Sequence, residues 1–151
     1  DGAERMKIIK KDAKKNNLEV ISFCDLNNIP NLIKNNRRNY SVESWLNSLK
    51  NSSLVVTDSF HGMVFAIIFK KNFYVFLNKK NGTSRINSLL KDLDLESRII
   101  NNLDLIQYNI NNIDWNSVEI RLEKLKLISM NFLDQFFDRV LKCEVDKKKY
   151  D

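Results

Sequence analysis

The chemistry of this chain centres on its single histidine, His61, which stands in the segment Ser59-Phe60-His61-Gly62. An imidazole has an ordinary pKa of about 6.5, so it can both donate and accept a proton near neutral pH. The hydroxyl of Ser59 and the backbone amides that follow it could bind an anion. From composition alone, however, a lone histidine beside an apolar run is more often a structural residue. Either Asp58 or Ser59 could cap the helix that follows. Asp58 could instead orient His61, but capping is the simpler interpretation of Asp58.

Arg85 is the second candidate, because its planar guanidinium can form two parallel hydrogen bonds with a carboxylate or a phosphate. We expect Ser84 to cap a helix to about residue 91, which places Arg85 in the first turn. Arg98 is a weaker candidate that we expect in a surface ion pair. One histidine and scattered carboxylates form no ligand cluster, so no metal site is expected.

A strand and a helix must position His61. The run Leu54 to Thr57 is short, apolar and β-branched, which is typical of a buried strand in a parallel sheet. A helix should follow the polar turn, and Phe73 to Leu77 predicts a second strand. We expect Leu54–Thr57 to be a central strand, with His61 and Arg85 at the same edge of the sheet, where open α/β folds bind ligands.

The remaining pattern predicts a single domain over residues 1–151. A helix over 3–15 ends at Asn16-Asn17 and feeds a strand over 18–23. Ser41 caps a helix through Lys50, in which Trp45 is expected in the core and not as a sugar-stacking platform. Residues 98–100 form a short edge strand. A loop is predicted over 25–39 and mixed structure over 101–112. Ser117 opens a long helix to about Cys143, so that 116–143 packs on the domain. Its wide apolar stripe predicts either a second partner segment or a few exposed apolar residues.

Composition narrows the function classes. The net charge is +6, but basic and acidic residues are interspersed and no aromatic residue stands among basic ones, so nucleic-acid binding ranks lowest. Three glycines argue against a glycine-rich phosphate loop. Cys24 and Cys143 have no partner pattern and indicate a reducing compartment. With no apolar run of membrane-spanning length, we expect a cytoplasmic location that includes the inner face of the membrane.

Three ordered blocks carry a family resemblance. They are Ser41-Val42-Glu43-Ser44-Trp45-Leu46, then Val55 to Gly62 with Phe65, and then Gly82-Thr83-Ser84-Arg85-Ile86-Asn87-Ser88-Leu89-Leu90. Together, over residues 41 to 98, they resemble the C-terminal half of the polysaccharide pyruvyl transferase family. The resemblance implies a Rossmann-like, open and mainly parallel α/β sheet with helices on both faces, forming the C-terminal lobe of a GT-B-like enzyme with two lobes. Because the chain starts at Asp1 with a helix already under way, we expect an N-terminal lobe before it.

The resemblance implies transfer of the enolpyruvyl carbon of phosphoenolpyruvate onto two hydroxyls of a bacterial surface polysaccharide, giving a cyclic ketal and phosphate. It implies that His61 is catalytic, that Ser59, Phe60, Gly62, Asp58 and Arg85 bind substrate, and that no cofactor is needed beyond the phosphoenolpyruvate donor. Some family members carry arginine two residues before the histidine, where this chain has Ser59, so the donor itself stays open. One lobe presents half a site, and we expect it to be inactive alone.

Two other classes stay open. One is the nucleotide-sugar-binding lobe of a GT-B-type glycosyltransferase, which would share the architecture and the basic crevice. The other is a non-catalytic binding module, in which replacing His61 would change neither ligand binding nor pathway activity.

Overall fold

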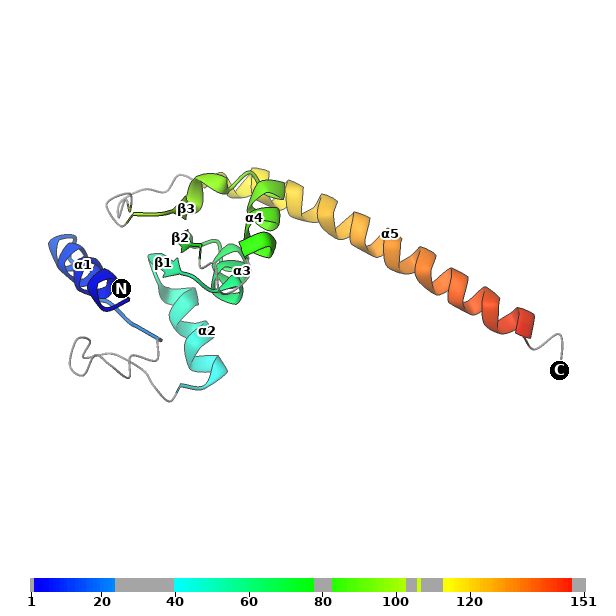
Figure 1. The fold of residues 1–151 in the computed structure, drawn as a ribbon, viewed down its shortest axis with the longest axis horizontal. Coiled ribbons are helices and arrows are strands. Elements are labelled where there is room, and N and C mark those ends of the chain that lie inside the picture. Colours follow the sequence, from blue (N-terminus) through cyan, green and yellow to red (C-terminus); the bar gives the residue numbers. More distant parts are fainter. Residues whose placement is uncertain (1, 24–39, 78–82, 103–105, 107–112, 148–151) are drawn as a thin grey trace. The chain divides into compact units, whose positions relative to one another are not determined.

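A computed structural model of the chain describes residues 2–23, 40–77, 83–102, 106 and 113–147 (Figure 1). The chain divides into two compact units, Asp1–Ile113 and Asp114–Asp151. The first unit holds an α/β arrangement and the second holds one long helix, and each is described by itself. The predicted loop over 25–39, most of 101–112 and Cys24 lie outside the described residues.

The sheet of the first unit has three parallel strands, β1 (Leu54–Thr57), β2 (Asn72–Phe76) and β3 (Ile99–Ile100). They lie in the order β1-β2-β3. This confirms the α/β class and the parallel sheet. The expectation that Leu54–Thr57 is central was wrong for the described sheet, in which β2 is the middle strand and β1 lies at an edge. The described part of 18–23, predicted as a strand, forms only an isolated β-bridge at Ser22.

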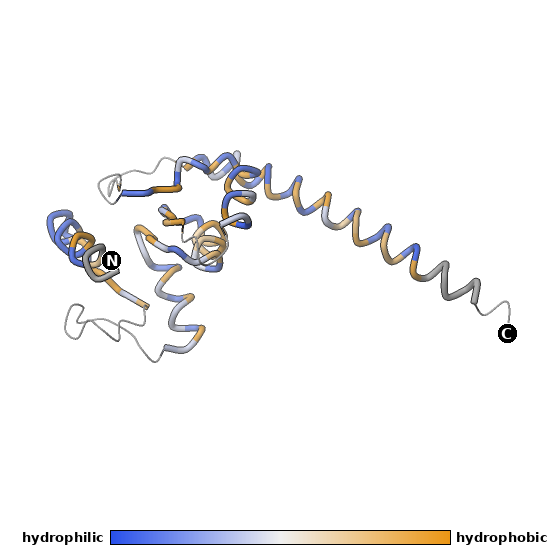
Figure 2. Tube along the Cα trace, in the orientation of Figure 1, coloured by the Kyte–Doolittle hydropathy of each residue, from blue (hydrophilic) through white to orange (hydrophobic). Residues whose placement is uncertain are grey.

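Both faces of β2 are buried, which explains its continuous apolar sequence. Phe73 and Val75 point to one face and are fully buried, whereas Tyr74 and Phe76 point to the other. On that second face, Tyr74 and Phe76 cluster with Ile100 and Ile106, and Ile9 of helix α1 (Gly2–Lys15) packs against the cluster. Figure 2 shows apolar positions on the strands and on the helix that follows β1.

Helices α2 (Val42–Asn51) and α3 (Phe60–Ile68) lie next to each other in the first unit. Ser41 caps α2 as predicted, because its hydroxyl accepts a hydrogen bond from the Ser44 amide at 3.2 Å. Helix α3 packs against β1 and β2. The ring of Trp45 in α2 meets that of Phe65 in α3 edge-on, with the centroids 5.4 Å apart. Trp45 is therefore half-buried by aromatic packing, in line with its predicted core role.

Helix α4 (Thr83–Asp92) and the short 3-10 helix η2 (Glu96–Arg98) connect β2 to β3. Ser84 is the second residue of α4 and not its cap, which corrects the sequence prediction. Arg98 also differs from its prediction, because it is only 7% exposed and is not in a surface ion pair. Its guanidinium carbon lies 5.7 Å from the centroid of the Tyr74 ring, and its Nε has no hydrogen-bond partner among the described residues.

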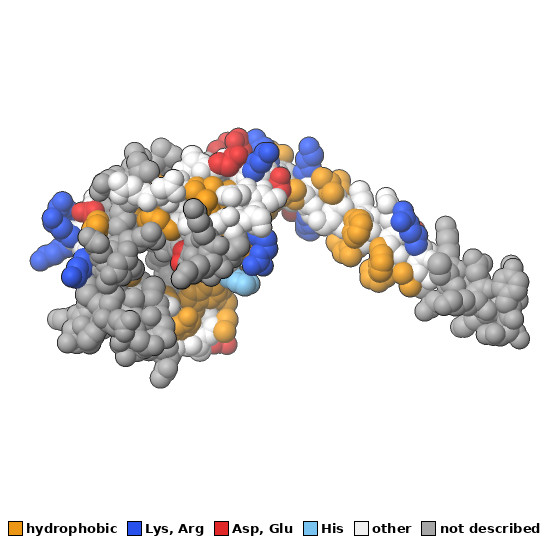
Figure 3. All heavy atoms as spheres, viewed as in Figure 1, with side chains coloured by type: hydrophobic (Ala, Val, Ile, Leu, Met, Phe, Trp, Pro, Cys, Tyr) orange, Lys and Arg blue, Asp and Glu red, His pale blue; other side chains and the backbone are white. Residues whose placement is uncertain are grey.

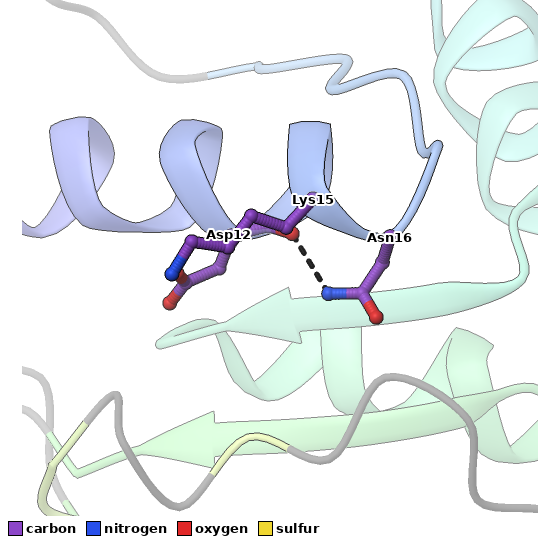
Figure 4. Close-up of polar contacts among 3 residues, drawn as sticks. All are labelled: Asp12, Lys15 and Asn16. Atoms are coloured by element: carbon purple, nitrogen blue, oxygen red, sulfur yellow. Dashed lines mark hydrogen bonds and ion pairs between the residues drawn. The ribbon is translucent and has the colours of Figure 1, made fainter.

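Three helices end in the same way, on a residue with left-handed backbone that is not glycine. These residues are Asn17, Lys70 and Asp94, with φ of 54°, 52° and 61°. In each case the next amide reaches back five residues, as when Leu18 donates to the Ala13 carbonyl at 2.9 Å. At the end of α1 the side-chain amide of Asn16 also donates to the carbonyl of Asp12 at 2.8 Å (Figure 4). The predicted end of this helix at Asn16-Asn17 is thus confirmed.

Helix α5 (Trp115–Lys147) makes up the second unit. Asp114 caps it, since its Oδ1 accepts hydrogen bonds from the amides of Asn116 and Ser117 at 3.1 and 3.2 Å. The helix therefore begins before Ser117 and continues past Cys143, which corrects both predicted ends. Large apolar side chains are exposed along it, including Phe132 and Phe137. Among the described residues, no helix is long and apolar enough to cross a membrane.

Candidate functional site

The turn between β1 and α3 is held by hydrogen bonds that the chain makes with itself. Ser59 caps α3 from an extended conformation, with φ −97° and ψ 132°. Its hydroxyl accepts from the Gly62 amide at 3.4 Å, and its carbonyl accepts from the Met63 amide at 3.1 Å. Capping therefore belongs to Ser59, whereas Asp58 is exposed one residue earlier. The simpler interpretation of Asp58, as the cap, was wrong.

His61 is the second residue of α3 and its side chain is exposed. Figure 3 shows this single histidine at the surface. Its ring lies edge-on to that of Phe60, with the centroids 6.0 Å apart and the planes at 77°. Within the described part of the chain, the amides of Phe60 and His61 have no hydrogen-bond acceptor. Two consecutive N–H groups are thus left for a ligand beside the imidazole.

Arg85 comes to this place from the first turn of α4. Its guanidinium carbon lies 5.1 Å from the centroid of the Phe60 ring, within the range of a cation–π interaction. The ring of Phe60 therefore contacts both the imidazole of His61 and the guanidinium of Arg85. The sequence placed His61 and Arg85 at one edge of the sheet, and their common contact with Phe60 agrees with that placement.

Positive and negative groups meet at this turn. The N-terminus of α3 carries a partial positive charge, and neither α3 nor α4 has an acidic residue in its first turn, but the exposed acidic residue Asp58 lies directly before the cap of α3. Arg85 adds a full positive charge on an exposed side chain. The described residues contain no group of three or more potential metal-ligating side chains. This arrangement can bind an anion and place a proton donor or acceptor next to it.

One residue of the turn was missed by the sequence analysis. Thr57, the last residue of β1, accepts a hydrogen bond from the Ser59 amide at 3.0 Å through its Oγ1. The same oxygen lies against Gly62, where an added Cβ would be 2.5 Å away from it. The side chain that lies close to Gly62 is therefore that of Thr57 of the same chain. A threonine at a strand end before a polar turn was the only signal in the sequence.

Comparison with known proteins gives one match. The family model described as polysaccharide pyruvyl transferase matches residues 4–80, about half of the chain. The matched range contains β1, α3, β2 and His61, and it ends before Arg85. A search of curated proteins and a search of solved structures each found no significant match. The motif blocks and the parallel α/β fold agree with this match, which covers half of the chain. This chain therefore belongs to the polysaccharide pyruvyl transferase family of transferases.

Proposed function

We propose that the protein transfers pyruvate from phosphoenolpyruvate to two hydroxyls of a sugar in a surface polysaccharide, forming a cyclic ketal. The observation that supports this most is the meeting of Phe60, His61 and Arg85 at the N-terminus of α3. An acid–base group, a guanidinium group and two amides that have no acceptor among the described residues lie together there, in a member of the family named for this transfer.

The reaction makes three demands on these residues. The methylene carbon of phosphoenolpyruvate gains a proton and becomes a methyl group, while a sugar hydroxyl loses its proton and its oxygen bonds to the adjacent carbon. The oxygen of a second hydroxyl then bonds to the same carbon as the carbon–oxygen bond to phosphate breaks, and the proton of that hydroxyl leaves with the departing phosphate. A positioned side chain must move the protons, and fixed donors must stabilise the departing phosphate.

Each demand has a candidate in the turn. His61 transfers a proton or donates a charge-assisted hydrogen bond to the phosphate. Arg85 binds the carboxylate or the phosphate with its two-pronged guanidinium. The amides of Phe60 and His61, with the hydroxyl proton of Ser59, complete the anion site. Asp58, exposed at the same turn, lies where it can contact the acceptor sugar.

The site on this chain is open, because His61, Ser59 and Arg85 are all exposed. A transfer that must exclude water needs a second wall over these residues. We propose that this wall is an N-terminal lobe and that the present chain is the C-terminal lobe of a GT-B-like enzyme. The acceptor would then bind between the two lobes, and the isolated chain would be inactive. A cytoplasmic location stays a prediction.

The test is phosphate release from phosphoenolpyruvate by the protein joined to its N-terminal lobe, with a panel of glycan acceptors. We expect His61→Ala to lower kcat by about 10² to 10⁴, the range for removing a general acid or base. Arg85→Gln should mainly raise the KM for phosphoenolpyruvate, and the exposed Arg139→Gln in α5 is a matched control that should change neither.

Four outcomes would contradict the proposal. Phosphate release that does not depend on an acceptor would indicate hydrolysis and not transfer to a sugar. Release that His61→Ala leaves unchanged would remove His61 from the reaction. No release with any acceptor, together with protection of the protein against heat by a nucleotide-sugar, would favour the glycosyltransferase alternative. Wild-type binding and pathway activity in His61→Ala would instead favour a non-catalytic module.

A further inference from the structure

We propose that Thr57 is a positioning residue of this site, which holds the segment from Ser59 to His61 in place through its side-chain oxygen. The inference rests on the proposed function for its catalytic consequence. Its structural part concerns the ligand-free protein and can be tested without any substrate.

The first observation is the hydrogen bond from the Ser59 amide to Thr57 Oγ1, at 3.0 Å. Ser59 in turn caps α3 through Gly62 and Met63. Thr57 therefore holds Ser59 in place, and Ser59 in turn caps the start of α3. Thr57 also accepts the hydrogen bond of the Ser59 amide. Among the described residues, the amides of this turn that remain without an acceptor are those of Phe60 and His61, next to the imidazole.

The second observation is independent of that bond. A Cβ added to Gly62 would lie 2.5 Å from Oγ1, 3.2 Å from Cβ and 3.4 Å from Cγ2 of Thr57. The end of β1 and the first turn of α3 are thus in direct contact, with His61 immediately before the contact and Phe60 one residue further back. Because threonine is branched at Cβ, its χ1 angle is restricted, and the buried Gly62 limits it further. The oxygen is held on the side where the Ser59 amide lies.

Two substitutions separate the effect of the Thr57 side-chain oxygen from the effect of the side-chain shape. Thr57→Val keeps the volume and the branching but removes the acceptor, whereas Thr57→Ser keeps the oxygen and removes a methyl group. We expect hydrogen exchange of the Ser59 amide, measured by NMR on the full chain, to accelerate roughly two- to tenfold in Thr57→Val. Exchange in Thr57→Ser should stay at the wild-type rate. Thr57→Ala replaces Thr57→Val if the latter does not fold.

The second readout is the imidazole resonance of His61, which is the only histidine of the chain. Its chemical shift should move in Thr57→Val and return to the wild-type value in Thr57→Ser. A purely structural role for Thr57 would lower the unfolding temperature and leave the Ser59 exchange rate and the His61 chemical shift unchanged in the folded protein. Unchanged Ser59 exchange or an unchanged imidazole signal in Thr57→Val would overturn the proposal.

The catalytic consequence is read from the enzyme joined to its N-terminal lobe, well below its unfolding temperature. Thr57→Val should lower kcat by about tenfold, with Thr57→Ser within about threefold of wild type. Equal kcat values for Thr57→Val and the wild type would overturn the positioning role. If the wild type itself turns over no acceptor, the proposed function has failed, and Thr57 is judged on the Ser59 and His61 signals alone.

Discussion

Replacing Gly62 with alanine tests the packing of α3 on the end of β1. Alanine is the better helix former by about 1 kcal/mol, so propensity alone predicts a more stable protein. The new methyl group, however, would lie 2.5 Å from Thr57 Oγ1 and 3.2 Å from Thr57 Cβ. Rotating Thr57 would only exchange its oxygen for its methyl group and would break the hydrogen bond from Ser59.

The balance of these terms favours destabilisation. An extra methyl group in a packed interior costs about 1–3 kcal/mol, and the lost hydrogen bond costs about 1 kcal/mol more. After the gain in helix propensity, we expect Gly62→Ala to lower the free energy of unfolding by about 1–3 kcal/mol. A urea titration monitored by tryptophan fluorescence measures this change in stability, because Trp45 of α2 packs on Phe65, which lies in α3 together with Gly62.

The control is the same substitution in a Thr57→Ala background, in which the oxygen and the methyl group of the neighbour are gone. There the penalty of Gly62→Ala should shrink by about half or more, a coupling that two residues in contact show. A rise of the urea midpoint for Gly62→Ala beside an intact Thr57 would refute the close contact. Equal penalties in the two backgrounds would place the cause elsewhere.

Three further predictions follow from other parts of the fold. Lys70→Gly should raise the free energy of unfolding by about 1 kcal/mol, because Lys70 has a φ of 52° that a side chain disfavours. The control Lys71→Gly makes the same change of charge and should lower the free energy of unfolding. Thermal unfolding measures both variants. Arg98→Lys should destabilise by about 2 kcal/mol in urea titration, because a compact ammonium group cannot replace a buried guanidinium stacked on an aromatic ring. The pKa of Glu43 is lowered below 4.5, mainly by a backbone hydrogen bond and to a smaller extent by a hydrogen bond with the Ser41 side chain. NMR titration should therefore show that this pKa rises in Ser41→Ala. The stabilisation from the Glu43 carboxylate is present above that pH and is lost as the pH falls through the folded pKa.

The sequence was sufficient where the structure depends on local signals. The β-branched run at Leu54 predicted β1, and Ser41 was predicted as the cap of α2 because it is a hydroxyl residue directly before an amphipathic stretch. His61 and Arg85 could be placed at one edge because the carboxyl ends of parallel strands meet there. The exit of α1 at Asn17 was also visible, since asparagine tolerates left-handed backbone.

The parts that the sequence did not predict depend on partners from other segments. The order of strands is not encoded in any one strand, so the edge position of β1 was missed. The stretch from Leu18 to Phe23 was predicted as a strand that follows the first helix, but a strand also needs a neighbour to pair with. Arg98 is charged, and charged side chains usually lie at the surface. Among the described residues, the ring of Tyr74 beside its guanidinium explains its burial. Either Asp58 or Ser59 could cap α3, and no local rule chose between them.

The turn before α3 also has a consequence for the thermodynamics of binding. Hydrogen bonds within the chain, at Thr57, Ser59 and Gly62, fix the shape of this turn. An anion that binds to the turn does not have to order it, so this part of the association carries little conformational entropy cost. Calorimetry of phosphate binding should accordingly show a small heat-capacity change, because an open polar site that is formed in advance buries little apolar surface.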